Sequence, residues 1–169
     1  MAITRLNHAV LYVRDVDRSV EFYRSALGFE PITQFPGAAF LRAPDSTNDH
    51  DLGLFGIGAG ATASPAGRSS VGLYHLAWEV DTLAELERLA GRLAELGALV
   101  GASDHSTTKS LYAKDPDGLE FEVAWLVPAE LLDEPAIAGK ASTRPLDLAR
   151  EIGRYGAQTR GGVGVSISA

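Results

Sequence analysis

The chain has 169 residues, 46% of them hydrophobic, which is enough to build the core of one globular domain or of two half-domains that share a core. A net charge of −7, with 15 scattered Lys and Arg residues, argues against nucleic acid and anionic membrane surfaces as partners. The absence of cysteine excludes disulfides and thiolate metal sites, so His, Asp and Glu are the expected ligands of any metal.

The first half of the chain predicts a strand, a helix and further short strands. The run LNHAVLYV contains His8 and then alternates between the two sides of a strand. The next segment has the spacing of an amphipathic helix, with Asp17 as its cap and Gly28 as its stop. Turn residues then separate β-like runs over residues 31–43 and 50–58.

The second half repeats this pattern about 67 residues later. His75 stands in the alternating run LYHLAWEV as His8 stands in the first run. Thr82 and Glu85 form a capping box for a second helix, Gly97 ends it, and three β-like runs follow. The residues expected on the buried face of this helix are Leu86, Ala90, Leu93 and Leu96.

The repeat predicts an α+β fold of two βαβββ modules, at about residues 1–60 and 71–127, within one domain of residues 1–127. The glycine-rich segment 53–70 lacks the Lys-Ser/Thr ending of a phosphate loop and is expected to be a flexible connection. Residues 128–169 lie outside the repeat and predict a C-terminal tail with one short helix, an appendage suited to contact between subunits.

Location and partner class follow from what the sequence lacks. The N-terminal residues show no signal-peptide pattern, and no apolar run is long enough to cross a bilayer, so we expect a cytoplasmic protein. Since nucleic acid and membranes are disfavoured, the expected partner is a small molecule.

Strand parity places three possible metal ligands on one face of the sheets. In both histidine strands the apolar residues that receive the helix alternate with His8 and His75, so both imidazoles are expected on the opposite face. Glu122, in the run DPDGLEFEV, has the same orientation, and a cation would offset the cost of burying its carboxylate. Two histidines and one carboxylate suit non-haem Fe(II) with open positions. The alternative is that the histidines are hydrogen-bonded core residues and the glutamate lies on a solvated face.

These features resemble the vicinal oxygen chelate superfamily, which includes glyoxalases, extradiol ring-cleaving dioxygenases, epimerases and drug-resistance proteins. The resemblance covers about residues 1–127 and rests on the paired modules, His8, His75 and the run that contains Glu122. It implies one cupped, incomplete β-barrel around a divalent metal, with the helices outside. Membership alone does not decide the chemistry.

The remaining histidines favour the extradiol branch of the superfamily. Glyoxalases and epimerases typically take a fourth ligand from the last strand of the first module, and the 67-residue offset assigns that position to Phe55, which cannot bind a metal. The run HDLGLF, beginning at His50, resembles the extradiol strand that opens with an acid/base histidine. His105 and Tyr112 resemble the histidine and tyrosine that those enzymes use around the substrate.

The resemblance therefore implies an Fe(II) extradiol dioxygenase, with Mn(II) as a possible metal, that opens a catechol with O2 to a muconic semialdehyde-type product. The implied ligands are His8, His75 and Glu122, and the implied catalytic residues are His50, His105 and Tyr112. A homodimer is expected. The alternatives are a metal-dependent lyase or isomerase of the glyoxalase or epimerase kind, and a non-catalytic drug-binding resistance protein.

Overall fold

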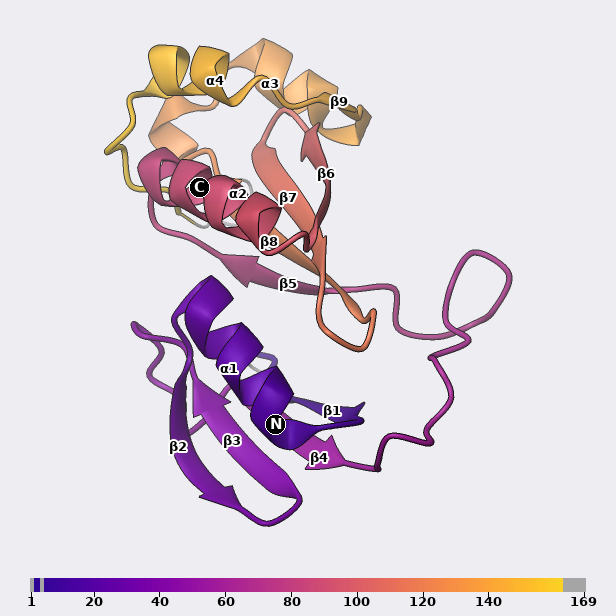
Figure 1. Ribbon diagram of the computed structural model, residues 1–169. Helices are drawn as coiled ribbons and strands as arrows, with labels where there is room; N and C mark the ends of the chain where they lie inside the picture. Colours follow the sequence, from indigo (N-terminus) through magenta and orange to yellow (C-terminus); the bar gives the residue numbers. More distant parts are fainter. Residues whose placement is uncertain (1, 4, 163–169) are drawn as a thin grey trace. The chain divides into compact units, whose positions relative to one another are not determined.

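The computed structural model describes residues 2–3 and 5–162, and the chain folds into two compact units. Unit 1 comprises Met1–Pro65 together with Asp115–Leu119, and unit 2 comprises Ala66–Lys114 together with Glu120–Ala169. Each unit has its own sheet with a helix against it (Figure 1). No helix in the described ranges is long and apolar enough to span a bilayer.

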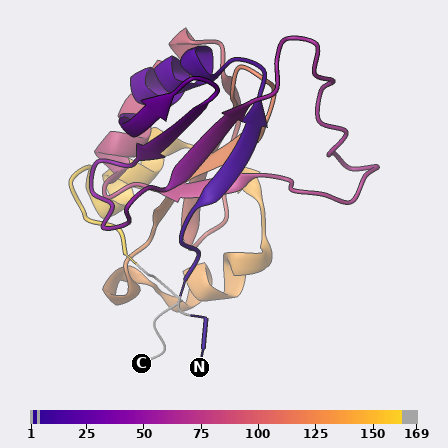
Figure 2. The ribbon, with the colours of Figure 1, turned by 90° about the horizontal axis from the view of Figure 1, so that it is seen from below.

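Unit 1 is the first predicted βαβββ module. Its elements are β1 (Ala9–Val13), α1 (Val16–Leu27), β2 (Glu30–Phe35), β3 (Ala38–Arg42) and β4 (Leu52–Gly56). The strand order is β1-β4-β3-β2, with β1 parallel to β4 and the other pairs antiparallel. Helix α1 covers one face of this sheet (Figure 2), because its apolar stripe of Val16, Val20, Tyr23 and Ala26 is buried.

The cap of α1 differs from the prediction. Asp15, rather than Asp17, has the extended backbone of a cap, and its carboxylate accepts a hydrogen bond from the Arg18 backbone N–H. Asp17 lies in the first turn of the helix, where it accepts a hydrogen bond from the Gln34 side-chain amide. Gly28 ends the helix as predicted, at a φ of 76° that glycine adopts without a steric penalty.

Unit 2 contains the second βαβββ module. Its elements are β5 (Leu76–Glu79), α2 (Leu83–Glu95), β6 (Leu99–Asp104), β7 (Thr108–Lys114) and β8 (Glu120–Leu126). They are ordered β5-β8-β7-β6, with β5 parallel to β8, so the strand order of unit 1 is repeated. The predicted α+β fold of two βαβββ modules is therefore confirmed. Neither sheet closes into a barrel by itself, and a cupped barrel made by both modules stays a prediction.

The boundaries of α2 follow the sequence pattern, and Leu86 and Leu93 are buried as predicted, but Leu83 and Leu89 complete the buried face in place of Ala90 and Leu96. Thr82 caps the helix by accepting a hydrogen bond from the Glu85 backbone N–H, and Gly97 follows its end at a φ of 66°. The buried residues are Leu83, Leu86, Leu89 and Leu93. Leu96 is exposed because the helix ends at Glu95, and Ala90 is only half-buried.

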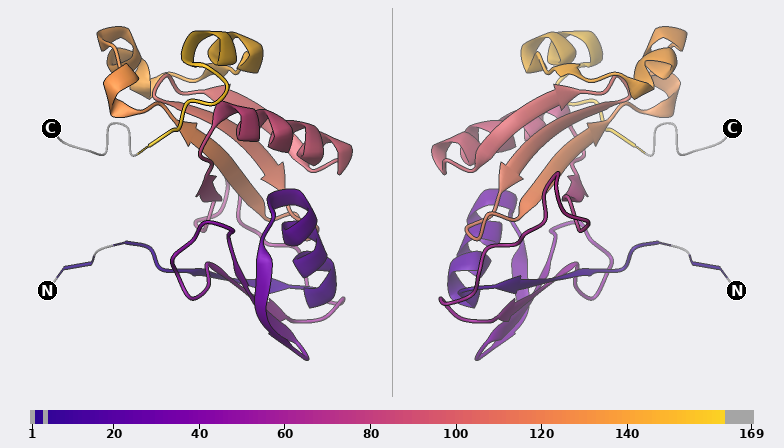
Figure 3. Two further views of the ribbon diagram at one scale, coloured as in Figure 1. Left: turned by 90° about the vertical axis from the view of Figure 1, so that its left-hand side faces the viewer. Right: turned by 90° about the vertical axis from the view of Figure 1, so that its right-hand side faces the viewer.

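The C-terminal segment is built into unit 2 and is not the appendage that the sequence predicted. Its elements are η1 (Ala129–Leu131), α3 (Glu134–Ala138), η2 (Gly139–Ala141), β9 (Arg144–Pro145) and α4 (Leu148–Tyr155). Strand β9 extends the sheet by pairing with β6, and α4 packs against α2, the helix that lies along the sheet (Figure 3). Helix α4 corresponds to the short helix that the sequence predicts for this segment, and residues 163–169 lie outside the described residues.

Candidate metal and catalytic site

Glu122 and His75 form a close pair in unit 2. Glu122 lies in the middle of β8, and His75 directly precedes β5, the parallel neighbour of β8. The Nε2 atom of His75 is 3.0 Å from an Oε atom of Glu122, and the glutamate side chain is 13% exposed. Ser110, on the adjacent strand β7, donates a hydrogen bond to the other carboxylate oxygen of Glu122. Strand pairing and this hydroxyl therefore hold both groups on one face of the sheet.

The spacing of the pair fits two ligands of one metal ion. Donor atoms that each lie about 2.1 Å from a divalent metal, at right angles to one another, are about 3.0 Å apart. The other ring nitrogen of His75, Nδ1, is buried and has no hydrogen-bond partner among the described residues. Within either unit, the described residues contain no group of three or more His, Cys, Asp or Glu side chains that could hold a metal. The third predicted ligand, His8, belongs to unit 1, and its ligation stays a prediction.

Tyr112 and His105 continue the site along β7. Tyr112 is directly opposite Glu122 in the β7–β8 pairing, and its ring centroid is 5.9 Å from that of His75. The Tyr112 hydroxyl is 2.9 Å from Nε2 of His105, which follows the end of β6. Burial raises the pKa of Tyr112, and the negative charge of Glu122 raises it further. The phenol therefore keeps its proton at neutral pH and can donate it in a hydrogen bond.

His8 and His50 lie together in unit 1. They precede β1 and β4, which are parallel and paired in register from Ala9 and Leu52, so both histidines are at the same end of the sheet. Their ring centroids are 4.6 Å apart, and His50 also packs edge-on against Phe40. The Nδ1 atom of His50 is 2.9 Å from a carboxylate oxygen of Asp49, which leaves Nε2 for other partners.

Asp51, the neighbour of His50, has a structural role. Its buried carboxylate accepts hydrogen bonds from the backbone N–H of Ala43, the Ser46 hydroxyl and the Asn48 side-chain amide. These contacts close the loop between β3 and β4. Both oxygens are occupied, so Asp51 is a poor candidate for a metal ligand.

The strand register corrects the residue assigned to the fourth-ligand position. In unit 2, Glu122 pairs with Ala77, which is two residues after His75. In unit 1, the residue two positions after His8 is Val10, and it pairs with Gly53. Gly53 is therefore the equivalent of Glu122, and Phe55 is two residues too far along β4. The constant 67-residue offset gave Phe55 because the segments between the paired strands differ in length. Since glycine has no side chain, the expectation that this position supplies no ligand holds.

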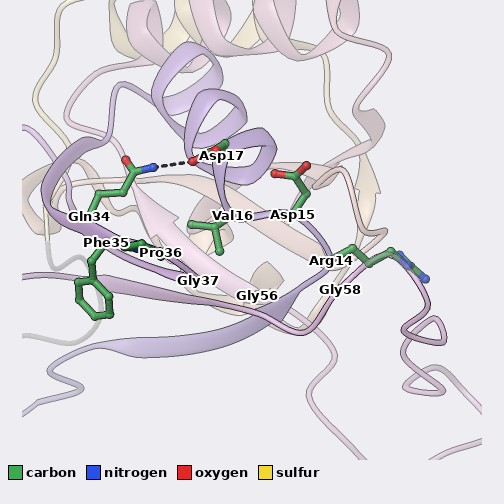
Figure 4. A pocket seen from close by; sticks show the side chains of 10 residues that line it. All are labelled: Arg14, Asp15, Val16, Asp17, Gln34, Phe35, Pro36, Gly37, Gly56 and Gly58. Carbon is green, nitrogen blue, oxygen red and sulfur yellow. Dashed lines mark hydrogen bonds between the residues drawn. The ribbon is translucent and has the colours of Figure 1, made fainter.

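An open hollow of about 500 Å³ in unit 1 lies apart from all of these residues. It is between the start of α1 and the β2–β3 turn, and Figure 4 shows the hydrogen bond from the Gln34 amide to Asp17 among the residues that line it. Arg14, at its edge, pairs with Asp117 at 2.7 Å. The charged side chains that line it are engaged with the protein, and none of the predicted site residues is among them.

The sequence of the chain matches a known protein superfamily. A model of the Glyoxalase/Bleomycin resistance protein/Dioxygenase superfamily matches residues 5–123. The chain belongs to this superfamily. Superfamily members bind a divalent metal, which agrees with the donor atoms of His75 and Glu122, and they include dioxygenases, glyoxalases and resistance proteins. Membership establishes the fold and these classes, but not one reaction among them.

Individual relatives of the superfamily come from more than one of these classes. The chain is 32% identical over 120 residues to a catechol-2,3-dioxygenase of Bacillus subtilis, covering 71% of this chain and 41% of the relative. It is 29% identical over 135 residues to glyoxylase I 4 of Arabidopsis thaliana, covering 72% of this chain and 70% of the relative. A glyoxylase/bleomycin resistance protein/dioxygenase domain from Frankia sp. EAN1pec shares the fold, with a TM-score of 0.61 and 23% identity over 73% of this chain and 92% of that one.

Two polar residues of the site were not found from the sequence. Ser110 is two residues before Tyr112, so strand parity already places it on the face of Tyr112 and could have identified it. Thr143 was not detectable in this way. Its hydroxyl is 3.2 Å from Nδ1 of His105, but it lies outside the repeat and no motif marks it.

Proposed function

We propose that this protein is an extradiol ring-cleaving dioxygenase that opens a catechol with O2, using Fe(II) or Mn(II) held by His8, His75 and Glu122. The observation that carries the proposal is the arrangement in unit 2, where the His75–Glu122 pair lies beside a phenol that is hydrogen-bonded to a histidine. Gly53 at the equivalent position of unit 1 adds no ligand from that strand, so positions on the ion would stay open for a bidentate substrate and O2.

The protein side chains would supply binding and proton transfer. When bound, the divalent ion supplies Lewis acidity and an electron path between the catechol and O2. His50 would take a proton from a substrate hydroxyl through Nε2 and return one later, since Nδ1 faces Asp49. Tyr112 would donate a hydrogen bond to a substrate oxygen, and His105 would support Tyr112 and the adjacent hydroxyl. Both atoms of O2 enter the product as the ring bond beside the diol breaks.

Oxygen consumption tests the proposal directly. The protein would be loaded with ferrous iron without air and then supplied with air-saturated buffer and each of a small panel of catechols. We expect uptake of dissolved oxygen with at least one catechol, together with a yellow ring-opened product. A protein that binds iron stoichiometrically but consumes no oxygen with any catechol would contradict the proposal.

The rival functions predict different outcomes of the same experiment. A lyase or isomerase of the glyoxalase or epimerase kind would turn over its substrate without oxygen uptake, but it would lack a fourth ligand at Gly53. A non-catalytic drug-binding protein would hold no stoichiometric metal. The homodimer and the cytoplasmic location remain predictions alongside the proposed activity.

A further inference from the structure

His105 stands between two hydroxyl groups that come from different parts of unit 2. Its Nε2 atom is 2.9 Å from the Tyr112 hydroxyl, and its Nδ1 atom is 3.2 Å from the Thr143 hydroxyl. The imidazole is half-buried, whereas Thr143 is exposed. The three side chains therefore form one hydrogen-bonded row in which the histidine has a neighbour on each ring nitrogen.

A neutral imidazole carries one proton, so the hydrogen bonds along this row can run from donor to acceptor in either of two directions. In the first, Thr143 donates to Nδ1, and the Nε2–H of His105 donates to the oxygen of Tyr112, which leaves the phenolic proton free. In the second, Tyr112 donates to Nε2, and the Nδ1–H of His105 donates to Thr143, which occupies the phenolic proton. Only the first direction allows Tyr112 to donate to a substrate oxygen.

The C-terminal segment holds Thr143 in this position. Strand β9 begins at the next residue and pairs with β6 through Arg144 and Asp104. The Arg144 guanidinium also contacts the Asp104 carboxylate at 3.3 Å and the Ser106 hydroxyl at 2.9 Å, on either side of His105. Thr143 is thus tied to the β6–β7 turn by backbone pairing and by its neighbour's side chain.

The turn that carries His105 is itself constrained. Ser106 has a φ of 65°, which is uncommon for a residue other than glycine, and its backbone N–H donates to the Asp104 carboxylate. Added to Gly139 of the C-terminal segment, a Cβ atom would overlap the Ser106 side chain, so the segment packs closely against the turn. Both partners of the Thr143–His105 contact are therefore held by the protein rather than by each other alone.

We propose that Thr143 is a positioning residue that keeps His105 in the Nε2–H tautomer, so that the Tyr112 hydroxyl points its proton to the substrate. The choice of this tautomer rests on the proposed function, because it is the one that frees the Tyr112 proton for a substrate, but the tautomer can be measured without turnover. A residue outside the repeated modules would in this way direct a hydrogen bond inside the site.

The tautomer can be measured on the metal-free protein. Two-bond ¹H–¹⁵N spectra distinguish Nδ1–H from Nε2–H imidazoles, and a His105→Gln variant assigns the signal. We expect His105 to be in the Nε2–H form in the wild type and in Thr143→Ser. In Thr143→Val, which keeps the shape of the side chain but loses the hydroxyl donor, we expect a larger fraction of the Nδ1–H form. The Nδ1–H form in the wild type, or an unchanged tautomer in Thr143→Val, would overturn the inference.

Turnover of the iron-loaded protein gives a second readout. We expect Thr143→Val to lower kcat/KM roughly threefold to tenfold, the range for one lost hydrogen bond, and Thr143→Ser to restore most of it, with iron content unchanged in both. Equal losses in the two variants would contradict a role for the hydroxyl. If the wild type consumes no oxygen, the proposed function fails while the tautomer measurement still decides the inference.

Discussion

At the residue scale, the contacts of His50 support its proposed role as an acid/base group, although it lies in the loop before β4. Its side chain is 19% exposed, although the run DSTNDHD around it is polar. Contacts with the rings of His8 and Phe40 orient the imidazole, and Asp49 engages Nδ1. An imidazole with a fixed ring and an unoccupied nitrogen can accept a proton and return it, so this arrangement is suited to proton transfer.

Replacing His50 tests this role. We expect His50→Phe to keep the ring contacts and metal binding but to lose oxygen uptake by roughly 10²- to 10⁴-fold, because phenylalanine cannot carry a proton. Steady-state oxygen uptake, with iron content and catechol binding measured on the same samples, checks the prediction. Asp49→Asn serves as a control that retains the imidazole. Full turnover in His50→Phe would remove His50 from the mechanism.

At the element scale, the C-terminal segment is attached to the sheet of unit 2 through a buried lysine. Lys109 of β7 is 1% exposed, and its ammonium group is 2.6 Å from Asp104 of β6 and 2.9 Å from Glu151 of α4. Burial alone would raise the pKa of Asp104, but the Lys109 hydrogen bond, with the Ser106 N–H and the charges of Lys109 and Arg144, lowers it. The stabilising contribution of the Asp104 carboxylate is therefore present above the ordinary carboxyl pKa of the unfolded chain. It is lost as the pH falls through the lowered pKa of Asp104 in the folded state.

Removing the lysine should loosen this attachment. We expect Lys109→Met to lower the free energy of unfolding by about 3–5 kcal/mol at pH 7, because it leaves the buried carboxylate of Glu151 without its cation and that of Asp104 with Arg144 alone. Urea denaturation followed by circular dichroism measures the loss. Lys114→Met, at an exposed position of the same strand, is the matched control. Equal midpoints for the two variants would show that the buried ion pairs contribute little.

At the scale of the whole molecule, the proposed ligands are divided between the two units. His8 belongs to unit 1, and His75 and Glu122 belong to unit 2. An ion held by all three would bind the folded chain and not the unfolded one, so it would stabilise the fold by mass action. Replacing a ligand in either unit should then weaken metal binding to a similar extent.

Metal titration checks whether His8 is a ligand. We expect Mn(II) at 100 times its dissociation constant to stabilise the wild type by about 2.7 kcal/mol, and His8→Ala and Glu122→Gln each to lose most of this gain. Thermal unfolding with and without Mn(II) measures it, and Glu87→Ala, at an exposed position of α2, should respond like the wild type. If His8→Ala gains as much stability from Mn(II) as the wild type, His8 is not a ligand.

The sequence by itself determined both modules and the face on which Glu122 lies, because caps, glycine stops and alternation are local properties of the chain. Only the tertiary structure decided that Gly53, rather than Phe55, is equivalent to Glu122, because register depends on which residues two distant strands pair. It alone also brought Thr143 to His105, through the pairing of β9 with β6. That contact joins residues 38 positions apart, and no periodicity in the chain encodes it.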